Sequence, residues 1–368
     1  MNERTLMYTA ITMLPSLNSI TYRPIIERCG GIEGFFLENR KALNCIYREF
    51  NLKPDHFDRK KAQLSAEKEV ENIERYNISI CTLEGHLYPR LLLECNDAPL
   101  VFYYKGNLTE TKSTTLAIVG TRRSTEYSRN RIDRLLYELA QSNQDIIIVS
   151  GLAFGIDGAA HQAAIKHNIK TYAVLGHGLH LIYPAAHKNM AEQIVNQGGV
   201  LISEFPTTIP IHPSNFLKRN RIIAGISYAT LIAESAEKGG AMSTARIAHS
   251  YNREIMAFPG RPEDKMSAGC NRLIKENIAS LIENSGDIIK QLGLEEVSFT
   301  PRQTRLNFFE EENNSLKVLN TLQEKGGANI DELAHLTHIP VQELSAVMIQ
   351  LELEEKVISL PGNNYIAK

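Results

Sequence analysis

A chain of 368 residues is too long for one ordinary hydrophobic core, so we expect two or three domains. Its hydrophobic fraction of 43% and charged fraction of 22% are those of a soluble globular protein and exclude a largely disordered chain. A net charge of −2 excludes a global attraction to nucleic acid, so any such binding must come from a local basic patch.

Cysteine usage and apolar runs bear on the compartment. The five cysteines include no CxxC pair, which argues against a zinc site and against a disulfide framework. The first residues lack the apolar core of a signal peptide, and no run approaches the ~20 apolar residues of a membrane span. We therefore expect a cytoplasmic protein with no membrane contact.

The N-terminal residues 1–65 are predicted to form a small helical module, because their apolar positions recur at helical spacing between prolines and glycines. Residues 14–20 resemble the hairpin of SAM-like or helix-hairpin-helix modules, in which glycines let the backbone approach a DNA phosphate. Here Ser16 and Asn18 replace those glycines. A packing or spacer role is therefore favoured, and a DNA contact stays open.

Residues 66–293 are predicted to form a Rossmann-like domain of the α/β class. A linking helix at 66–74 precedes two strands, at 78–82 and 100–104, that should extend one edge of the sheet. Further strands are expected near residues 116–120, 145–150, 171–175, 200–205, 229–234, 254–258 and 279–282. Because helical patterns separate these strands, the sheet should be doubly wound and mostly parallel, with ligands at the carboxyl ends of its strands.

The C-terminal part combines a linker with a small domain. Residues 294–313 mix charge, threonine and asparagine without periodicity, as linkers do. Within residues 314–368, three short helices at 316–322, 330–336 and 341–353 precede two strands around a turn at 361–364. This is the order of a winged-helix domain.

Two strand-to-helix junctions have the composition of anion sites. The apolar run 146–149 ends at Ser150 and Gly151 and opens a small-residue helix, and the strand before it ends at Gly120, Thr121 and Arg122. Unpaired backbone amides and the positive end of a helix dipole attract phosphate at such junctions. Two of them on adjacent strands would make one anion-binding crevice.

The strongest functional signal is Phe216 followed by Lys218, Arg219, Asn220 and Arg221 at the start of a helix. Basic side chains can pair with phosphates, and a phenylalanine can stack a base for ~1–3 kcal/mol. A later glycine turn ends at Gly240, and we expect Ser243 or Thr244 to cap the following helix and face an anion.

Other chemistries are disfavoured by the motifs. The chain has no GxxxxGK[ST] and no GxGxxG after the first strand, which argues against an ATPase or a dehydrogenase and for no cofactor. Asp157 and His161 could share a metal, but helix capping by Asp157 and a local polar contact by His161 are favoured. His177, His180 and His187 are interpreted as a polar rim.

With these motifs assembled, the chain resembles the DNA-processing protein A (DprA, or Smf) family. The resemblance rests on residues 120–122, 150–157, 173–176, 183–184, 219–225 and 269–271. It implies a bacterial single-stranded DNA-binding protein that is no enzyme, forms a homodimer through its Rossmann-like domain and helps load the RecA recombinase during natural transformation. His180 stands where the family often has an aspartate.

The resemblance also implies which residues meet DNA. Phosphate and base contacts would fall on Arg122, Phe216, Lys218 and Arg219, with Gly120, Ser150 and Gly151 lining the pocket. The full expected DNA-binding set is Gly120, Thr121, Arg122, Ser150, Gly151, Phe216, Lys218, Arg219, Asn220, Arg221, Gly240 and Ser243. The homodimer interface is expected near Leu273, Ile274, Ile278, Leu281 and Ile282.

An alternative is a nucleotide hydrolase on a similar sheet, in which Gly239, Gly240, Ser243 and Thr244 hold a nucleoside monophosphate. Such enzymes need a glutamate after the glycine-rich turn, and residues 245–248 contain no acid. A last expectation concerns the winged-helix domain, whose presumed recognition helix at 341–355 carries acids and no base. Because phosphates repel it, we expect a protein contact or a supporting role.

Overall fold

The computed structural model describes residues 3–14, 17–53, 58–110, 113–142, 144–294, 308–354, 356–360 and 364–368, without the side chains of 308–313 and 342. The chain divides into two compact units, Met1–Val297 and Ser298–Lys368. Most of the predicted linker lies outside the described residues, as do Ser16 of the N-terminal hairpin and 361–363 of the C-terminal turn. None of the described helices is both long and apolar enough to cross a membrane.

The first unit is built on a nine-stranded sheet of order β1-β2-β6-β5-β4-β3-β7-β8-β9. Its strands are β1 (Ser79–Thr82), β2 (Val101–Gly106), β3 (Thr114–Gly120), β4 (Ile146–Ser150), β5 (Thr171–Val174), β6 (Val200–Ser203), β7 (Ala229–Glu234), β8 (Glu254–Ala257) and β9 (Ser280–Leu281). The pairs from β6 to β9 are all parallel, and β1 and β2 are antiparallel at one edge. This confirms the predicted doubly wound, mostly parallel sheet and the edge position of the first two strands.

The central strands are buried on both faces, which explains their continuous apolar composition. In β3, Leu116 and Ile118 face one core cluster with helices α7 (Glu126–Gln141), α8 (Ile156–Lys166) and α13 (Ser285–Gln291). Ala117 and Val119 face the opposite cluster with α6 (Arg90–Leu93), α10 (Pro213–Gly225), α11 (Gly240–Ser250) and α12 (Ala268–Lys275). Helix α9 (Lys188–Asn196) contributes Ala191 and Ile194 to a third cluster.

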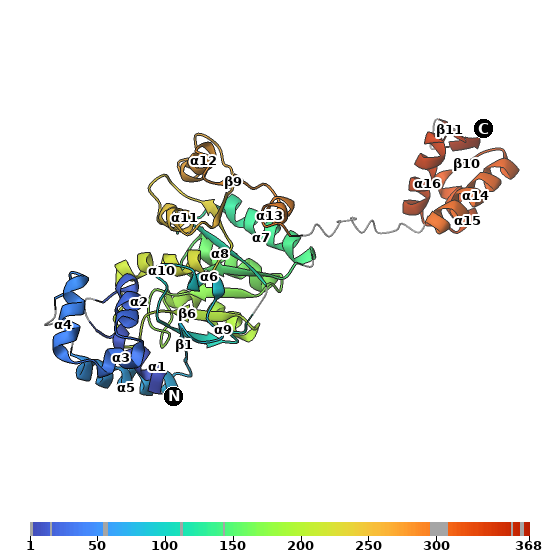
Figure 1. Ribbon diagram of the computed structural model, residues 1–368. Coiled ribbons are helices and arrows are strands. Elements are labelled where there is room, and N and C mark those ends of the chain that lie inside the picture. The colour runs from blue at the N-terminus through green and yellow to red at the C-terminus, as the bar shows by residue number, and fades with distance from the viewer. Residues whose placement is uncertain are drawn as a thin grey trace. The chain divides into compact units, whose positions relative to one another are not determined.

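That third cluster also joins the N-terminal helices to the sheet. These are α1 (Glu3–Thr12), α2 (Ser19–Arg28), α3 (Ile32–Leu37), α4 (Arg40–Glu49) and α5 (Arg59–Arg75), drawn in blue in Figure 1. Ile11, Ile25 and Phe35 are fully buried in one cluster with Tyr103 of β2 and Leu201 of β6. Helix α5 itself runs continuously across residue 65, where the sequence predicts a domain boundary.

In the predicted hairpin, the Asn18 side chain caps α2. Its Oδ1 accepts the backbone N–H groups of Ile20 and Thr21, at 2.9 and 3.1 Å. The Thr21 hydroxyl in turn accepts the Asn18 N–H, which completes a capping box. Leu17 is buried in the third cluster. Asn18 and Leu17 therefore make structural contacts in the first unit.

The second unit has the predicted winged-helix order. Its elements are α14 (Phe308–Lys325), β10 (Ala328–Asn329), α15 (Ile330–Thr337), α16 (Val341–Leu353), β11 (Val357–Leu360) and β12 (Asn364–Ala367). Val318, Leu322, Leu333 and Leu351 are buried in a core of its own. The two-residue strand β10, too short to leave a sequence pattern, adds to β12.

The five apolar residues expected at the homodimer interface differ in how far they are exposed. Leu273 and Ile282 are 4% and 1% exposed and lie in the cores of the first unit, and Ile274 and Ile278 pack against one of them. Of the five, Leu281 is exposed. Leu273 and Ile282 are therefore not available to a dimer surface, whereas the half-buried Ile274 and Ile278 and the exposed Leu281 keep part of their side chains accessible.

Candidate nucleic-acid interface

The first unit contains a cavity where the strand order reverses. Strand β3 has β4 on one side and β7 on the other. The chain leaving β3 continues toward β4 and the chain leaving β7 continues toward β8, so the two connections diverge at the carboxyl ends of these strands. The cavity there has a volume of about 300 Å³. Its lining includes seven residues of the expected DNA-binding set: Gly120, Thr121, Arg122, Phe216, Arg219, Asn220 and Gly240.

The turn after β3 brings Arg122 to the cavity mouth. The backbone N–H of Thr121 donates to the Glu234 carbonyl at 2.8 Å, which ties this turn to β7. A Cβ on Gly120 would overlap Ile156 and lie 2.8 Å from that same carbonyl, so only glycine allows the close approach. Arg122 itself is exposed, so its guanidinium is available to an anion.

Arg122, Phe216 and Tyr183 form what we call the Phe216 platform. The Arg122 Cζ lies 5.6 Å from the centroid of the Phe216 ring, and the Tyr183 ring centroid lies 5.7 Å from the same ring. A Cβ on Gly176 would lie 2.9 Å from Phe216 Cδ1, so this glycine admits the phenylalanine. The platform offers a cation and two aromatic faces at one place, which suits a phosphate and a neighbouring base.

Tyr183 is the functional candidate that the sequence reasoning did not single out. It lies at the end of the loop after β5, one of the turns expected at the carboxyl edge, and it is 49% exposed. An exposed aromatic ring in such a turn is the signal that could have identified it. Its partner Phe216 comes from α10, so the pairing itself requires the fold.

Arg219 lies behind the platform as a buried cation, 3% exposed. Its guanidinium donates to the carbonyls of Gly151, at 2.6 Å, and Val174, which end neighbouring strands. A Cβ on Gly151 would overlap that guanidinium. Burial lowers the pKa of Arg219 to about 10, and the nearby Asp157 carboxylate opposes this shift. The group stays charged at neutral pH and gives the cavity a fixed positive potential.

Among the described residues that line this cavity, Asp157 is the one with a carboxylate side chain. Burial raises its pKa, while Arg219 and the Ala153 amide act in the opposite direction. The predicted capping of α8 by Asp157 is wrong, because Gly155 occupies the N-cap position and Asp157 lies inside the first turn. Asp157 instead balances Arg219.

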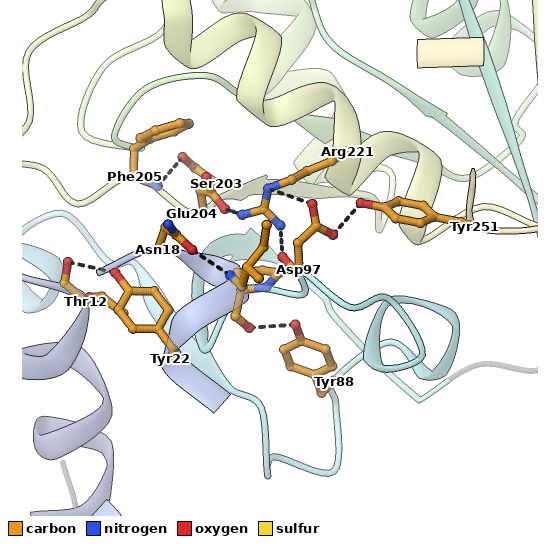
Figure 2. Close-up of polar contacts among 12 residues, drawn as sticks. Thr12, Asn18, Tyr22, Tyr88, Asp97, Ser203, Glu204, Phe205, Arg221 and Tyr251 are labelled. Carbon is orange, nitrogen blue, oxygen red and sulfur yellow. Dashed lines mark hydrogen bonds and ion pairs between the residues drawn. The ribbon is translucent and has the colours of Figure 1, made fainter. Parts of the chain in front are cut away.

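Arg221 points away from the cavity, toward the end of β6. Figure 2 shows its guanidinium in an ion pair with Glu204 and hydrogen-bonded to the Asp97 carbonyl, while the Tyr251 hydroxyl donates to the Asp97 carboxylate. Burial raises the pKa of Glu204, and Arg221 opposes that shift. The Arg221 side chain is only 12% exposed. Its contacts hold α10 against the sheet.

Lys218 is exposed on the outer side of α10. It borders a separate hollow of about 380 Å³ together with Asn18, Ser19 and Arg221, rather than the cavity behind Phe216. The structure therefore separates the basic triplet: Arg219 faces the cavity, whereas Lys218 and Arg221 lie beside the N-terminal helices.

Ser150 and Ser243 do not line the cavity. Ser150 is fully buried, and its hydroxyl donates to the Ile118 carbonyl at 2.6 Å. The predicted capping of α11 by Ser243 or Thr244 is wrong. The helix begins at Gly240 with Gly239 as N-cap and no side-chain cap, so its first backbone amides border the cavity without a side-chain acceptor.

The histidines make local contacts. His161 Nδ1 lies 2.8 Å from the Thr171 hydroxyl, and burial lowers the His161 pKa to about 3, so the ring is neutral. His177 accepts the Tyr183 N–H, and His187 lies 2.9 Å from the Leu152 carbonyl. Within the described part of the chain, no three His, Cys, Asp or Glu side chains gather as a metal site.

Comparison with known proteins points to one family. A family model for DNA recombination-mediator protein A matches residues 79–293, and a model for the DprA winged helix domain matches residues 310–363. The chain is 31% identical to Protein Smf of Synechocystis sp., over 95% of this chain and 91% of that protein. It is 34% identical to Protein Smf of Escherichia coli, over 79% and 78% of the two chains.

Solved structures agree. The X-ray structure of DNA processing protein A from Streptococcus pneumoniae has a TM-score of 0.65 at 26% identity, covering 79% of this chain and 98% of that one. A structure of DNA processing protein A from Helicobacter pylori, described for its single-stranded DNA binding mode, has a TM-score of 0.51 at 30% identity. It covers 59% of this chain and 96% of its own. These matches confirm the resemblance expected from the motifs.

Proposed function

This chain belongs to the family of DNA recombination-mediator protein A, and from that premise we propose that it binds single-stranded DNA at the cavity between β3 and β7. The observation that carries the proposal is the Phe216 platform, which places an exposed guanidinium and two aromatic rings at the mouth of a positively charged cavity. The Helicobacter pylori relative is described as binding single-stranded DNA, which supports the same ligand here.

Each group has a physical role in this proposal. Arg122 and the first amides of α11, from Gly240 onward, hold a backbone phosphate, and Arg219 adds a fixed positive potential from behind. An unpaired base stacks on Phe216 or Tyr183. None of these groups distinguishes base edges, so binding should show little sequence preference.

The remaining members of the expected set act less directly. We propose that Lys218 contacts a phosphate on the outer side of α10. Gly151 and Ser150 act by holding the strand ends around Arg219, and Arg221 acts by fixing α10. Thr121 and Asn220 line the cavity, whereas Ser243 would meet DNA only at its rim.

A wider role is proposed from the membership of this family. We propose a cytoplasmic recombination mediator that protects incoming single strands and helps load the RecA recombinase in natural transformation, acting as a homodimer of the sheet domain. The division into a helical module, a DNA-binding domain, a linker and a winged-helix domain at residues 1–65, 66–293, 294–313 and 314–368 belongs to the same proposal. Helix α5 spans the first of these boundaries and helix α14 spans the last.

We propose that the site performs no chemistry. A base-releasing hydrolase needs a free carboxylate, and the carboxylate found on the described lining, Asp157, lies buried beside Arg219. Release of free base from nucleoside monophosphates would overturn this part of the proposal.

The DNA-binding proposal is tested by fluorescence anisotropy with single-stranded and duplex oligonucleotides of one sequence, repeated over a range of salt concentrations. We expect tighter binding to the single strand and a linear fall of log affinity with log salt. Equal affinity for duplex DNA, or an affinity that ignores salt, would contradict the assignment.

A further inference from the structure

A second and larger cavity lies beside the Phe216 platform and belongs to none of the roles above. Its volume is about 810 Å³, and it is an open hollow lined by the end of α5, the end of β2, residues 179–182 and helix α9. Leu179 and Ala191, each 2% exposed, contribute to an apolar floor. Apolar walls of this kind accept the ring of a base or another flat group.

The rim of this cavity carries two unpaired cations. Lys105 is the penultimate residue of β2 and Lys188 begins α9. Neither forms an ion pair with any carboxylate that the structure describes, Glu192 of the same lining included. Burial lowers the pKa of Lys105, and no neighbouring acid compensates for that burial. Such a charge gains most from an anion supplied by a ligand.

An aromatic pair stands beside the lysines. The ring of Tyr76 lies 5.8 Å from that of His180, and the Arg75 guanidinium lies 5.7 Å from the Tyr76 ring centroid. The Nδ1 atom of His180 is buried and has no hydrogen-bond partner among the described residues. Cations, an aromatic face and an unsatisfied ring nitrogen together suit a nucleotide, which offers phosphate, a stacking ring and polar base edges.

One loop connects this cavity to the Phe216 platform. Gly176 and Tyr183, near its two ends, pack against Phe216, and Leu179, His180 and Ile182, between them, line the second cavity. The Cα atoms of His180 and Tyr183 can be no more than about 11 Å apart along an extended chain. A strand held at the platform therefore needs only a few further nucleotides to reach the cavity.

We propose that single-stranded DNA leaving the Phe216 platform crosses this loop and enters the second cavity, where Lys105 and Lys188 hold its phosphates and Tyr76 stacks a base. The inference rests on the proposed function of the platform. It extends the binding site along the strand and makes affinity depend on strand length.

The test compares oligothymidylates of about 6 and about 20 nucleotides, the shorter sufficient for the platform alone. The variant Lys105→Ala/Lys188→Ala should lose roughly tenfold in affinity for the longer strand near 0.1 M salt, with little change for the shorter one. Its log affinity should also fall less steeply with log salt, by about 1.4 for two lost phosphate contacts. The control Lys68→Ala/Lys290→Ala removes the same charge from exposed positions outside both cavities.

The outcomes separate the two proposals. If the parent protein binds neither oligonucleotide, the platform itself is misassigned. If the parent binds both, and the cavity variant matches the surface-lysine control on the longer strand or loses affinity equally on both lengths, the second cavity holds no DNA.

A crosslinking experiment provides a readout independent of affinity. A 4-thiothymidine placed at successive positions of the longer strand should crosslink to Tyr76 at a position a few nucleotides from the one that crosslinks to Phe216. Crosslinks that reach Phe216 at one position and Tyr76 at none would overturn the inference.

Discussion

The guanidinium of Arg122 lies over the ring of Phe216, with its Cζ 5.6 Å from the ring centroid. The two residues come from different elements, the turn after β3 and the first turn of helix α10. They meet because the turn after β3 and the start of α10 both lie at the carboxyl edge of one sheet. A base and its phosphate approaching this pair would meet both partners together. The two side chains should nevertheless contribute in different ways.

The first prediction separates charge from stacking. Arg122→Ala should weaken single-strand binding and reduce the slope of log affinity against log salt by about 0.7, the value for one lost phosphate contact. Phe216→Ala should cost about 1–3 kcal/mol of binding free energy and leave that slope unchanged. Arg123→Ala is the matched control, because Arg123 is exposed and adjacent but does not line the cavity. An identical effect of Arg122→Ala and Arg123→Ala would refute the assignment.

The second prediction concerns the buried pair Arg219 and Asp157. Arg219→Met should lower the free energy of unfolding, because it removes two buried hydrogen bonds to carbonyls and the cation that lies near the buried Asp157 carboxyl. Gly151→Ala should also destabilise, since its Cβ would displace the guanidinium, whereas Gly240→Ala should not, because nothing lies within 4 Å of that position. Denaturant unfolding measures all three. A stable Gly151→Ala protein would contradict the packing described.

The same pair predicts a pH dependence. The pKa of Asp157 is raised in the folded state from 3.8, so folding favours its protonated form, and this contribution is lost as pH rises through the raised pKa. Without Arg219 that pKa rises further. The stability difference between the parent and Arg219→Met should therefore grow as pH rises through the raised Asp157 pKa of the parent. Asp157→Asn/Arg219→Met should remove most of this growth, and a difference that is constant with pH would exclude the coupling.

The third prediction treats Arg221 as a positioning residue. Arg221→Ala should destabilise the fold by about 3–5 kcal/mol, because Glu204 remains buried without a partner, and Arg221→Met/Glu204→Gln should recover much of that loss. At a temperature where the variants are folded, the salt slope of DNA binding should equal that of the parent. A reduced slope would instead place Arg221 on a phosphate.

The fourth prediction concerns the proposed homodimer and uses Leu281, which is exposed, as the residue to substitute. Leu281→Glu should dissociate a dimer of the sheet domain without unfolding it, because this side chain is 44% exposed. Leu273→Glu should unfold the protein, because that side chain is 4% exposed and its charge could not be solvated. Light scattering combined with thermal unfolding distinguishes the two. A dimer that survives Leu281→Glu would place the interface elsewhere.

The sheet and its carboxyl edge could be predicted because they depend on local patterns. Runs such as 146–149 are β-branched and continuous, so they indicate buried parallel strands, and glycine or arginine directly after a strand must lie at the shared edge. This reasoning brought Gly120, Arg122, Phe216 and Gly240 to one cavity without knowledge of the strand order.

The directions of neighbouring side chains on α10 could not be predicted in the same way. Successive residues of a helix point in different directions, so Lys218, Arg219 and Arg221 cannot all face one ligand. Which of them turns inward depends on the strand ends that α10 covers, and Arg219 meets two free carbonyls there. The prediction that Ser243 or Thr244 caps α11 is also wrong. The helix begins earlier than expected, at Gly240, and Gly239 occupies the N-cap position.

The last prediction concerns the winged-helix unit, whose α16 would enter the major groove if the domain read duplex DNA. Its described side chains include Glu343 and Glu352 and no lysine or arginine, and Lys356, which follows the helix, forms an ion pair with Glu354 at 2.7 Å. Glu355 lies outside the described residues. Ile349 and Leu353 are 60% and 81% exposed on the same helix, a composition suited to a protein contact and not to phosphates.

Deleting residues 313–368 should therefore leave single-strand affinity within a few fold of that of the full chain. Met1–Val297 is a compact unit whose hydrophobic clusters include none of the deleted residues, so circular dichroism should show that it stays folded. Adding lysines in place of Glu343 and Glu352 in the full chain should introduce duplex binding that the parent lacks, if charge is what excludes it. A folded truncation that has lost most of its single-strand affinity would mean that the winged-helix unit holds DNA through a surface other than α16.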